Sequence, residues 1–452
     1  MSTNRETETV TPQEDDPSPA MAKLGEPSRV RTASTPQAIT LRAGWPLIAA
    51  SWAVFFIGLG TVWHANGIFL VQWERTFGWG RGLIAGAFSL GGALSALTTP
   101  LIGRLADRYS VHRLILAGAL TMGMGLASLA LIQTPWHLYL TYTLAYMGFT
   151  LMGHVPIGAT LARTFQERRA LAIGIAHTGM GSGGILLAPL IPPLIAGIGW
   201  RWTLTVAALV TVGVLVPLGL TVFRRAPRGE RPQARQGGHG YTLREALGTW
   251  QFWVLAGGFV SANFALSGVG AHMVPFLADR GVSLQRGALA IALQALSHVG
   301  GKLTFAFLAE HFQPRYPLAV AYALGGLAIA LLAFVGAPWT AYVAASFVGL
   351  AMSATTVFQP ILGALYFGTL ALGAILGVLF AVTFSLASAG GAVAGIIYDA
   401  TGAYQLPFLL FLMLLVLGSL LVLAAGRRHT ALAPTQPTPS PAPSAPRPAH
   451  RS

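Results

Sequence analysis

The sequence predicts an all-α membrane protein in which twelve transmembrane helices form two pseudo-symmetric six-helix halves. Of its 452 residues, 54% are hydrophobic and only 9% are charged, whereas a soluble protein carries roughly a quarter charged residues. Twelve apolar stretches of about 20 residues follow one another, each long enough to cross a hydrocarbon core of ~30 Å. This composition excludes a cytosolic enzyme and a nucleic-acid-binding protein.

The apolar stretches fall into two groups of six. The first group lies at residues 45–71, 82–102, 114–133, 136–159, 170–196 and 202–223. The second lies at 249–276, 286–308, 317–336, 340–365, 370–397 and 405–425. We therefore expect an N-terminal half at 43–223, a basic cytoplasmic loop at 224–247 and a C-terminal half at 248–426.

Both ends of the chain are predicted to be disordered. Residues 1–42 are rich in Thr, Pro and Glu, and 427–452 are rich in Pro, so neither segment buries enough apolar surface to offset the entropy of ordering. A secretory signal would need a basic start and then an apolar stretch. The N-terminal segment instead has acidic residues at Glu6, Glu8, Glu14, Asp15 and Asp16.

The distribution of basic residues predicts the orientation in the membrane. The net charge of +14 is concentrated between apolar stretches. Near the spans, 18 Lys and Arg lie on the side of the tails and the central loop, and five lie opposite, at Arg75, Arg81, Arg201, Arg280 and Arg286. Because basic residues are retained on the cytoplasmic side, we expect a multi-pass protein of the cell inner (plasma) membrane with both termini cytoplasmic.

An internal repeat supports the division into halves. LADR at 105–108 and LAEH at 308–311 follow the second and eighth spans at an offset of 203 residues, and GWR at 199–201 and GAY at 402–404 repeat that offset. With an even number of spans per half, the repeats are parallel and related by an axis along the membrane normal.

The segment GRLADRYSVHR at 103–113 resembles the loop signature of the major facilitator superfamily, although Ser110 replaces its second Gly. The resemblance implies a latch between the cytoplasmic helix ends, in which Gly103 permits close approach and Asp107 accepts hydrogen bonds from basic residues. The alternative is a solvated turn whose arginines only anchor the topology. The expected latch residues, with Glu310 of the second copy, are Gly103, Arg104, Asp107, Arg108, Arg113 and Glu310.

Other segments resemble one branch of this superfamily. FGWGRGLIAGAFSL at 77–90, GWRWTL at 199–204 and the run from YFG at 366–368 to GGAVAGIIYDATGAY at 390–404 are similar to monocarboxylate transporters and oxalate/formate antiporters. The similarity extends from about 45 to 425. Within this region, the small-residue segments GMGSGG (179–184) and SAGGAVAG (388–395) are expected to be packing surfaces on which the halves rock.

Lys302 is the strongest candidate for a substrate-binding residue. It is the one Lys or Arg expected inside a span, where insertion of a charge costs roughly 2.5–3.5 kcal/mol. Its position eight residues before Glu310 matches the basic residue, usually Arg, with which this branch engages the substrate carboxylate. The alternative is that Lys302 extends its side chain to the cytoplasmic interface.

His298 lies one helical turn before Lys302, on the same helix face. In monocarboxylate transporters this position resembles that of a carboxylate linked to proton coupling, and the ordinary pKa of His suits a proton step near neutral pH. An anion bound at Lys302 would offset the charge of a proton on His298, so the two could bind together. The alternative is a neutral His bonded to a backbone carbonyl.

Three further observations concern the binding site. Thr383 lies where oxalate/formate antiporters place a second basic residue, and one buried cation favours a monoanion over oxalate. His64, Asn66 and Tyr146 are candidates to line the pathway, although such side chains in a bundle more often satisfy their neighbours. The His spacing contains no metal motif, and without cysteine there is neither a disulfide nor a thiolate site.

We therefore expect a secondary active transporter that moves a small organic anion, a monocarboxylate, by alternating access with proton symport. The alternatives are an anion exchanger of the oxalate/formate type, a drug or metabolite efflux antiporter, and a non-transporting sensor. A membrane enzyme is disfavoured because neither a carboxylate pair nor a Ser/His/Asp arrangement is recognisable, and no Walker loop indicates ATP. No cofactor is expected, and the carrier is expected to be a monomer in the lipid bilayer.

Overall fold

The computed structural model describes residues 41–165, 169–226, 240–333 and 338–425, and the described residues are almost entirely helical. The predicted tails, apart from the start of the first helix, and most of the predicted central loop lie outside these ranges. In the N-terminal half the helices are α1 (Leu41–Val62), α2 (Asn66–Phe77), α3 (Arg81–Arg108), α4 (Val111–Leu129), α5 (Pro135–Met152), α6 (His154–Thr164), α7 (Arg169–Thr221) and the short η1 (Phe223–Arg225).

In the C-terminal half the helices are α8 (Leu243–Leu247), α9 (Trp250–Asp279), α10 (Leu284–His311), α11 (Arg315–Ala333), α12 (Pro338–Phe367), α13 (Leu372–Ala387), α14 (Ala389–Thr401) and α15 (Gln405–Ala424). The short helix α8 was not expected, because the sequence predicted a loop there. Thr242 starts it with a capping box, in which the Thr242 amide donates to Glu245 Oε2 at 2.8 Å. This hydrogen bond lowers the pKa of the Glu245 carboxyl.

The described helices form the twelve predicted spans. Eleven helical segments are long and apolar enough to cross a membrane, and one of them, Leu171–Arg225, has 55 residues. At 1.5 Å per residue this segment would extend about 80 Å, far more than a bilayer needs. The backbone turns at Gly199, where φ is 82°, so α7 supplies the fifth and sixth spans. The predicted fold class is confirmed.

Three of the spans are interrupted within the membrane. The first breaks between α1 and α2, the fourth between α5 and α6 at Gly153, and the eleventh between α13 and α14 at Ser388. At Gly153 the cause is Pro156, since a proline has no N–H to pair with the carbonyl of Met152 four residues earlier. Interrupted helices place polar backbone inside the bundle, where it must be buried in protein or face a cavity.

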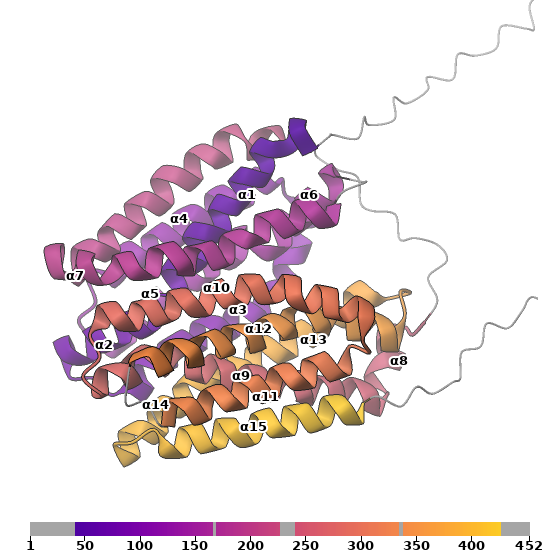
Figure 1. The fold of residues 1–452 in the computed structure, drawn as a ribbon. Coiled ribbons are helices and arrows are strands. Elements are labelled where there is room, and N and C mark those ends of the chain that lie inside the picture. The colour runs from indigo at the N-terminus through magenta and orange to yellow at the C-terminus, as the bar shows by residue number, and fades with distance from the viewer. Residues whose placement is uncertain (1–40, 166–168, 227–239, 334–337, 426–452) are drawn as a thin grey trace, which may run out of the picture. The chain divides into compact units, whose positions relative to one another are not determined.

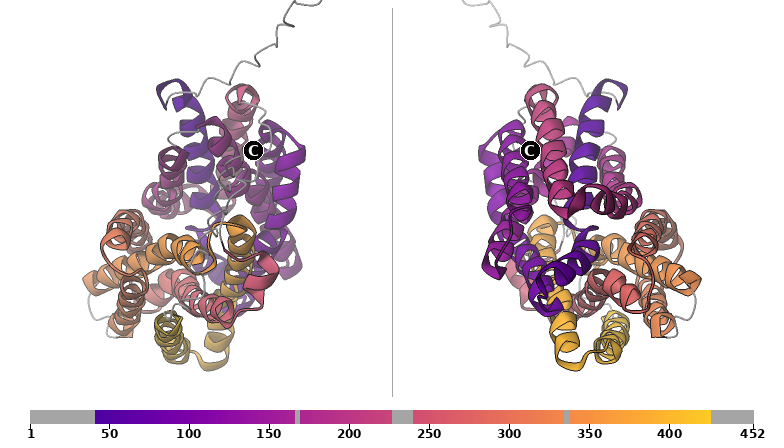
Figure 2. Two further views of the ribbon diagram at one scale, coloured as in Figure 1. Left: turned by 90° about the vertical axis from the view of Figure 1, so that its right-hand side faces the viewer. Right: turned by 90° about the vertical axis from the view of Figure 1, so that its left-hand side faces the viewer.

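The two halves meet along two symmetry-related helix pairs. Figures 1 and 2 show the indigo to magenta helices of the N-terminal half beside the orange to yellow helices of the C-terminal half. Across this boundary α3 packs on α13 and α14, and α7 packs on α10. Because α3 is the second span and α10 the eighth, exchanging the halves converts one contact pair into the other.

Small residues allow these crossings, as expected for the segments 179–184 and 388–395. In the first crossing, a Cβ on Gly395 would lie 2.6 Å from Gly82 Cα. In the second, a Cβ on Gly184 would lie 2.7 Å from Ala295 Cβ. The backbones at Gly82 and Gly395 therefore approach too closely for any side chain.

This crossing gives a stability prediction. Gly395→Ala would force apart two backbones, and we expect it to destabilise the protein by about 1–3 kcal/mol. The matched control is Gly377→Ala in α13, because nothing lies within 4 Å of a Cβ at that helical position, so it should be neutral or slightly stabilising. Thermal unfolding in detergent measures both variants. Equal melting temperatures for the two variants would contradict the close crossing of α3 and α14.

Candidate functional site

A cavity lies between the halves and is walled by both. The space inside it for the centres of water-sized molecules is about 50 Å³. Helices α2, α3 and α5 and the α1–α2 turn form its N-terminal wall, and α9, α10, α12 and α14 form the other. Its main side chains are aromatic, uncharged polar or sulfur-containing, with one imidazole: Trp63, His64, Asn66, Phe88, Ser89, Tyr146, Ser267, Gln294, Met352 and Ser388.

Three of the predicted site residues, His64, Asn66 and Tyr146, line this cavity. The Tyr142 hydroxyl donates to Asn66 Oδ1, and Asn66 Nδ2 donates to the Tyr146 hydroxyl at 3.3 Å. His64 Nε2 lies 3.2 Å from the Met180 carbonyl oxygen, so this nitrogen donates. Both Asn66 and His64 are therefore fixed by bonds within their own half.

Lys302 lies outside the cavity lining, closer to the C-terminal end of α10 than the residues of this helix that line the cavity. It is half-buried, and the nine residues that separate it from the helix end at His311 correspond to about 13 Å. Its charge acts on His298 in the same helix and on His154 and His177 of the N-terminal half. His298 Nε2 is buried and has no hydrogen-bond partner among the described residues.

The sequence missed the association of Lys302 with His154 and His177. The His154 and His177 rings are 5.6 Å apart and meet edge to face, and Phe55 contacts both. Within the described ranges, no three His, Asp or Glu side chains are arranged to hold a metal ion. The cluster brings one ammonium group and several imidazoles together across the boundary between the halves.

Thr383 is buried in the C-terminal half and does not line the cavity. It accepts a hydrogen bond from Gln359 Nε2 at 3.2 Å. Of the predicted latch residues, Arg104, Arg108, Arg113 and Glu310 are exposed, and the side chain of Asp107 lies outside what the structure describes. A Cβ on Gly103 would meet Val155 at 3.9 Å, an ordinary contact, so no close approach requires a glycine there in this conformation.

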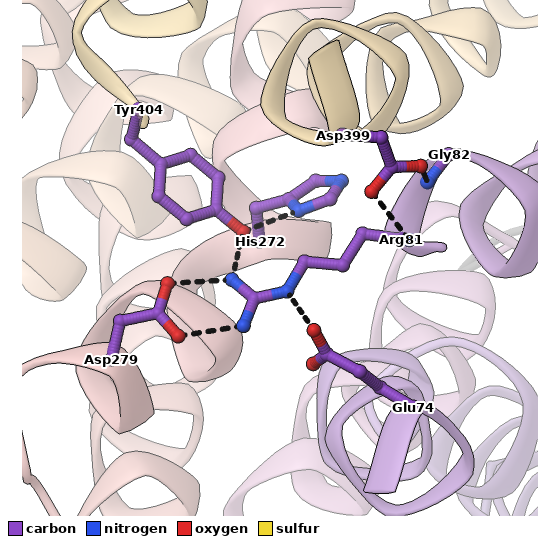
Figure 3. A network of polar contacts seen from close by, with 7 residues as sticks. All are labelled: Glu74, Arg81, Gly82, His272, Asp279, Asp399 and Tyr404. Atoms are coloured by element: carbon purple, nitrogen blue, oxygen red, sulfur yellow. Dashed lines mark hydrogen bonds and ion pairs between the residues drawn. The ribbon is translucent and has the colours of Figure 1, made fainter. Parts of the chain in front are cut away.

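A buried arginine joins the halves at the opposite end of α3 (Figure 3). The Arg81 side chain is 5% exposed, and its guanidinium lies 2.6 and 2.7 Å from the two carboxylate oxygens of Asp279 in α9. Glu74 of the N-terminal half accepts from Nε at 2.9 Å, and the ring of Tyr398 lies 4.1 Å from the guanidinium carbon. Bidentate, charge-assisted pairing of this kind is strong and geometrically specific.

Asp399 of α14 makes a second connection between the halves. Its carboxylate oxygens accept from the backbone N–H groups of Arg81 and Gly82, both at 2.8 Å. These are the first two residues of α3, whose N-cap Gly80 supplies no side-chain hydrogen bond. A carboxylate there pairs otherwise unpaired donors and complements the helix dipole.

A chain of hydrogen bonds links Arg81 to the C-terminal half. Its Nη1 donates to the Tyr404 hydroxyl at 2.9 Å, and that hydroxyl lies 2.9 Å from His272 Nδ1. His272 Nε2 donates to the Gly391 carbonyl oxygen at 2.8 Å. With Nε2 as donor, a neutral His272 accepts from Tyr404 through Nδ1, so each donor in the chain has an acceptor.

Charge counting along the sequence placed Arg81 among the loop charges of one membrane face, and the structure instead buries it. Two segments quoted for their family resemblance, 77–90 and 390–404, supply Arg81, Asp399 and Tyr404. The signal was therefore present in the motifs. What the sequence did not reveal was that these motifs meet.

The space between the halves is closed at the Arg81 end and open at the depth of Lys302. Beside Arg81, the halves share ion pairs and the Gly82–Gly395 crossing. At the level of Lys302, His154 is exposed, although it lies ten residues from the end of α6. The charge of Lys302 acts on it from the other half. An exposed side chain at that position indicates an open gap.

Known transporters resemble this chain over most of its length. Monocarboxylate transporter 11 of Homo sapiens is 28% identical over 401 residues, covering 85% of this chain and 83% of that protein. Monocarboxylate transporter 12 of Rattus norvegicus is 26% identical over 434 residues, covering 87% of each.

Solved structures share the fold at low sequence identity. A bacterial homolog of the human lysosomal transporter Spinster, in an inward-facing and occupied conformation, has a TM-score of 0.70 at 17% identity and covers 84% of this chain and 96% of its own. The nucleoside transporter NupG has a TM-score of 0.69 at 15% identity, with coverage of 84% and 100%. The family model of the Major Facilitator Superfamily matches residues 50–392; the chain belongs to this superfamily and is a transporter related to its monocarboxylate branch.

Proposed function

We propose that this protein is a secondary active transporter that carries a small organic monoanion, a monocarboxylate, by alternating access. The observation that carries the proposal is the cavity walled by both halves, together with a half-buried lysine in α10, one of the helices that line it. A lone cation inside the bundle is costly, and a carboxylate bound beside it offsets that cost. The substrate would then reach the site only from the side on which the halves are apart.

The charges near the site favour a monoanion. The groups on which the charge of Lys302 acts are the imidazoles of His154, His177 and His298. Thr383 lies in the neighbourhood where oxalate/formate antiporters have a second basic residue. A dianion would keep an uncompensated charge in a region of low dielectric. Exchange of the oxalate/formate type is the alternative that a second cation would have favoured.

We further propose proton symport, in which His298 tunes the coupling. His298 is one turn from Lys302 and also lies within electrostatic range of His64 in the cavity wall. A proton taken up beside Lys302 is tolerated best when an anion is present, because the pair adds no net charge to the site. The anion and the proton would then move together.

In the proposed orientation the tails are cytoplasmic and the conformation described here opens inward. Arg81 and its partners then form the external gate in a plasma membrane. In the opposite conformation, the exposed arginines of the segment 103–113 and Glu310 would close the cytoplasmic end. This latch requires Asp107 to accept hydrogen bonds from basic residues. The monomer contains both gates and the cavity, so we propose that it is the transport unit.

A second candidate function is efflux of a neutral or cationic aromatic compound. It is favoured by the rings of Trp63, Phe88 and Tyr146 and the thioether of Met352 in the cavity wall. Aromatic faces attract flat apolar groups and cations. The transport assay that follows separates this function from anion transport.

Uptake into proteoliposomes tests the anion proposal. The panel is labelled lactate, pyruvate, formate, oxalate and a neutral control, each with and without an inward proton gradient. We expect gradient-stimulated uptake of a monocarboxylate that Lys302→Ala reduces at least tenfold and that Lys302→Arg partly restores, because the positive charge is retained. Arg286→Ala, at the other end of the same helix, is the matched control and should transport normally.

Two results would contradict this assignment. If the native protein takes up no anion of the panel, the carboxylate proposal is wrong and efflux becomes the leading function. If Lys302→Ala transports a monocarboxylate at the native rate, the anion is held elsewhere.

A labelling experiment tests the gate. Since the protein has no cysteine, Ser388→Cys introduces a single thiol into the cavity wall. Arg81→Gln removes the bidentate ion pair with Asp279 that joins the halves at this end. We therefore expect this substitution to speed labelling at least tenfold by an impermeant maleimide added on the Arg81 side.

The control variant is Arg280→Gln, because the Arg280 guanidinium lies over the Phe276 ring of its own half at 3.8 Å. It should label at the native rate. Unchanged labelling of the Arg81 variant would show that the ion pair does not hold this end closed.

A further inference from the structure

His154 occupies an unusual position for an exposed side chain. It is the first residue of α6, directly after the break at Gly153, and therefore lies within the fourth span rather than at its end. Pro156 fixes this break, so the sequence places an imidazole at the start of a half-helix inside the bundle. The N-terminal end of a half-helix carries a partial positive charge.

Three rings enclose His154 within its own half. Phe55 lies 5.2 Å away, Phe149 lies 5.7 Å away nearly perpendicular to it, and His177 lies 5.6 Å away. Because His154 nevertheless remains exposed, its open side faces the gap between the halves. α7 and α10 cross beside this gap, where a Cβ on Gly181 would lie 2.1 Å from Val299 Cγ2. One turn from these residues, toward the open end, α7 carries His177 and α10 carries Lys302, so Lys302 lies on the opposite side of the gap from the two imidazoles.

His177 lies behind His154 and has an unsatisfied polar atom. Its Nε2 is buried and without a hydrogen-bond partner among the described residues, an arrangement that is unfavourable for a polar atom. Edge-to-face contact with both Phe55 and His154 holds the ring in place. Its position suits a residue that orients the His154 ring.

The electrostatics of the gap favour an anion between Lys302 and His154. The charged group that acts on the two N-terminal imidazoles from the other half is Lys302. A carboxylate entering the gap would meet an ammonium group on one side and an N–H donor on the other.

We propose that His154 is the N-terminal ligand of the anion that Lys302 holds, so that one carboxylate bridges the two halves. His177 is a positioning residue for the His154 ring. This inference rests on the proposed function and extends it: the substrate itself draws the open ends of the halves together, because each half holds the same carboxylate. A ligand shifts a conformational equilibrium only through such differential contacts.

Transport kinetics test the bridge with the labelled monocarboxylate that the native protein takes up from the panel of lactate, pyruvate and formate. His154→Leu removes the donor and keeps the bulk, so the half-saturating concentration should rise about tenfold, as expected for a hydrogen bond to a charged group. His154→Gln restores an amide donor and should stay within about threefold of native. His137→Leu, at the other end of the same span, is the matched control.

Spin labels provide a second readout. Thr221→Cys and Phe312→Cys place labels on exposed positions of the two halves at the Lys302 end, and in nanodiscs the saturating monocarboxylate should shorten the distance between them. In the His154→Leu background the same concentration should leave the distance unchanged, and His177→Gln should weaken the shortening.

The outcomes separate the two proposals. The bridge is overturned if the native protein takes up a monocarboxylate and His154→Leu has the same half-saturating concentration. It is also overturned if the spin-label distance in His154→Leu shortens at the same monocarboxylate concentration as in the native protein. Either result leaves the proposed anion transport intact. If the native protein takes up none of the three monocarboxylates, the proposed function fails and the bridge fails with it. If His154→Gln is as impaired as His154→Leu, the hydrogen bond is not the reason for the effect, and the bridge is overturned.

Discussion

The pairing of Arg81 with Asp279 is the interaction on which the arrangement of the halves depends. A guanidinium that is 5% exposed is too costly to bury without a partner, so wherever Arg81 is buried a carboxylate must accompany it. That carboxylate belongs to the other half, and the α3 backbone that carries Arg81 is itself capped by Asp399 of the other half. Two long-range pairings therefore fix the start of α3, and from this point α3 runs along α14 through the glycine crossing toward the cavity.

The same network explains how this end can also open. Glu74 and Asp279 are 30% and 31% exposed, so water already reaches the acceptor side of the ion pairs and can replace the guanidinium when the halves separate. A fully buried pair would lose several kcal/mol on separation without such replacement. The glycines at the α3–α14 crossing have no side chains that interlock, which leaves a smooth surface for a small rotation.

The sequence was sufficient for the architecture because span length, glycine and proline act locally. Apolar stretches of fixed length predict the spans, and Gly199 and Pro156 act on the backbone within one turn. The position of Lys302 was also predictable, since a lone cation in an apolar helix stands out. The burial of Arg81 was not, because a charge at a span end looks like a loop charge until its partner, 198 residues away, is placed beside it. The association of His154 and His177 with Lys302 was not predictable for the same reason, because each is an isolated histidine in the sequence and only the fold brings them near Lys302 of the other half.

The two ends of the space between the halves differ in how their charges are compensated. At the closed end the buried Arg81 has carboxylate partners from both halves, so its charge is compensated without substrate. At the open end Lys302 faces imidazoles and an empty gap, so closing it without an anion would bring a cation into a low-dielectric space without compensation. The free energy of closing the second end therefore depends on the presence of an anion, whereas that of closing the first does not. In such a carrier, the conformational change is unfavourable while the charge of Lys302 is uncompensated, and it becomes favourable when an anion from solution binds beside Lys302.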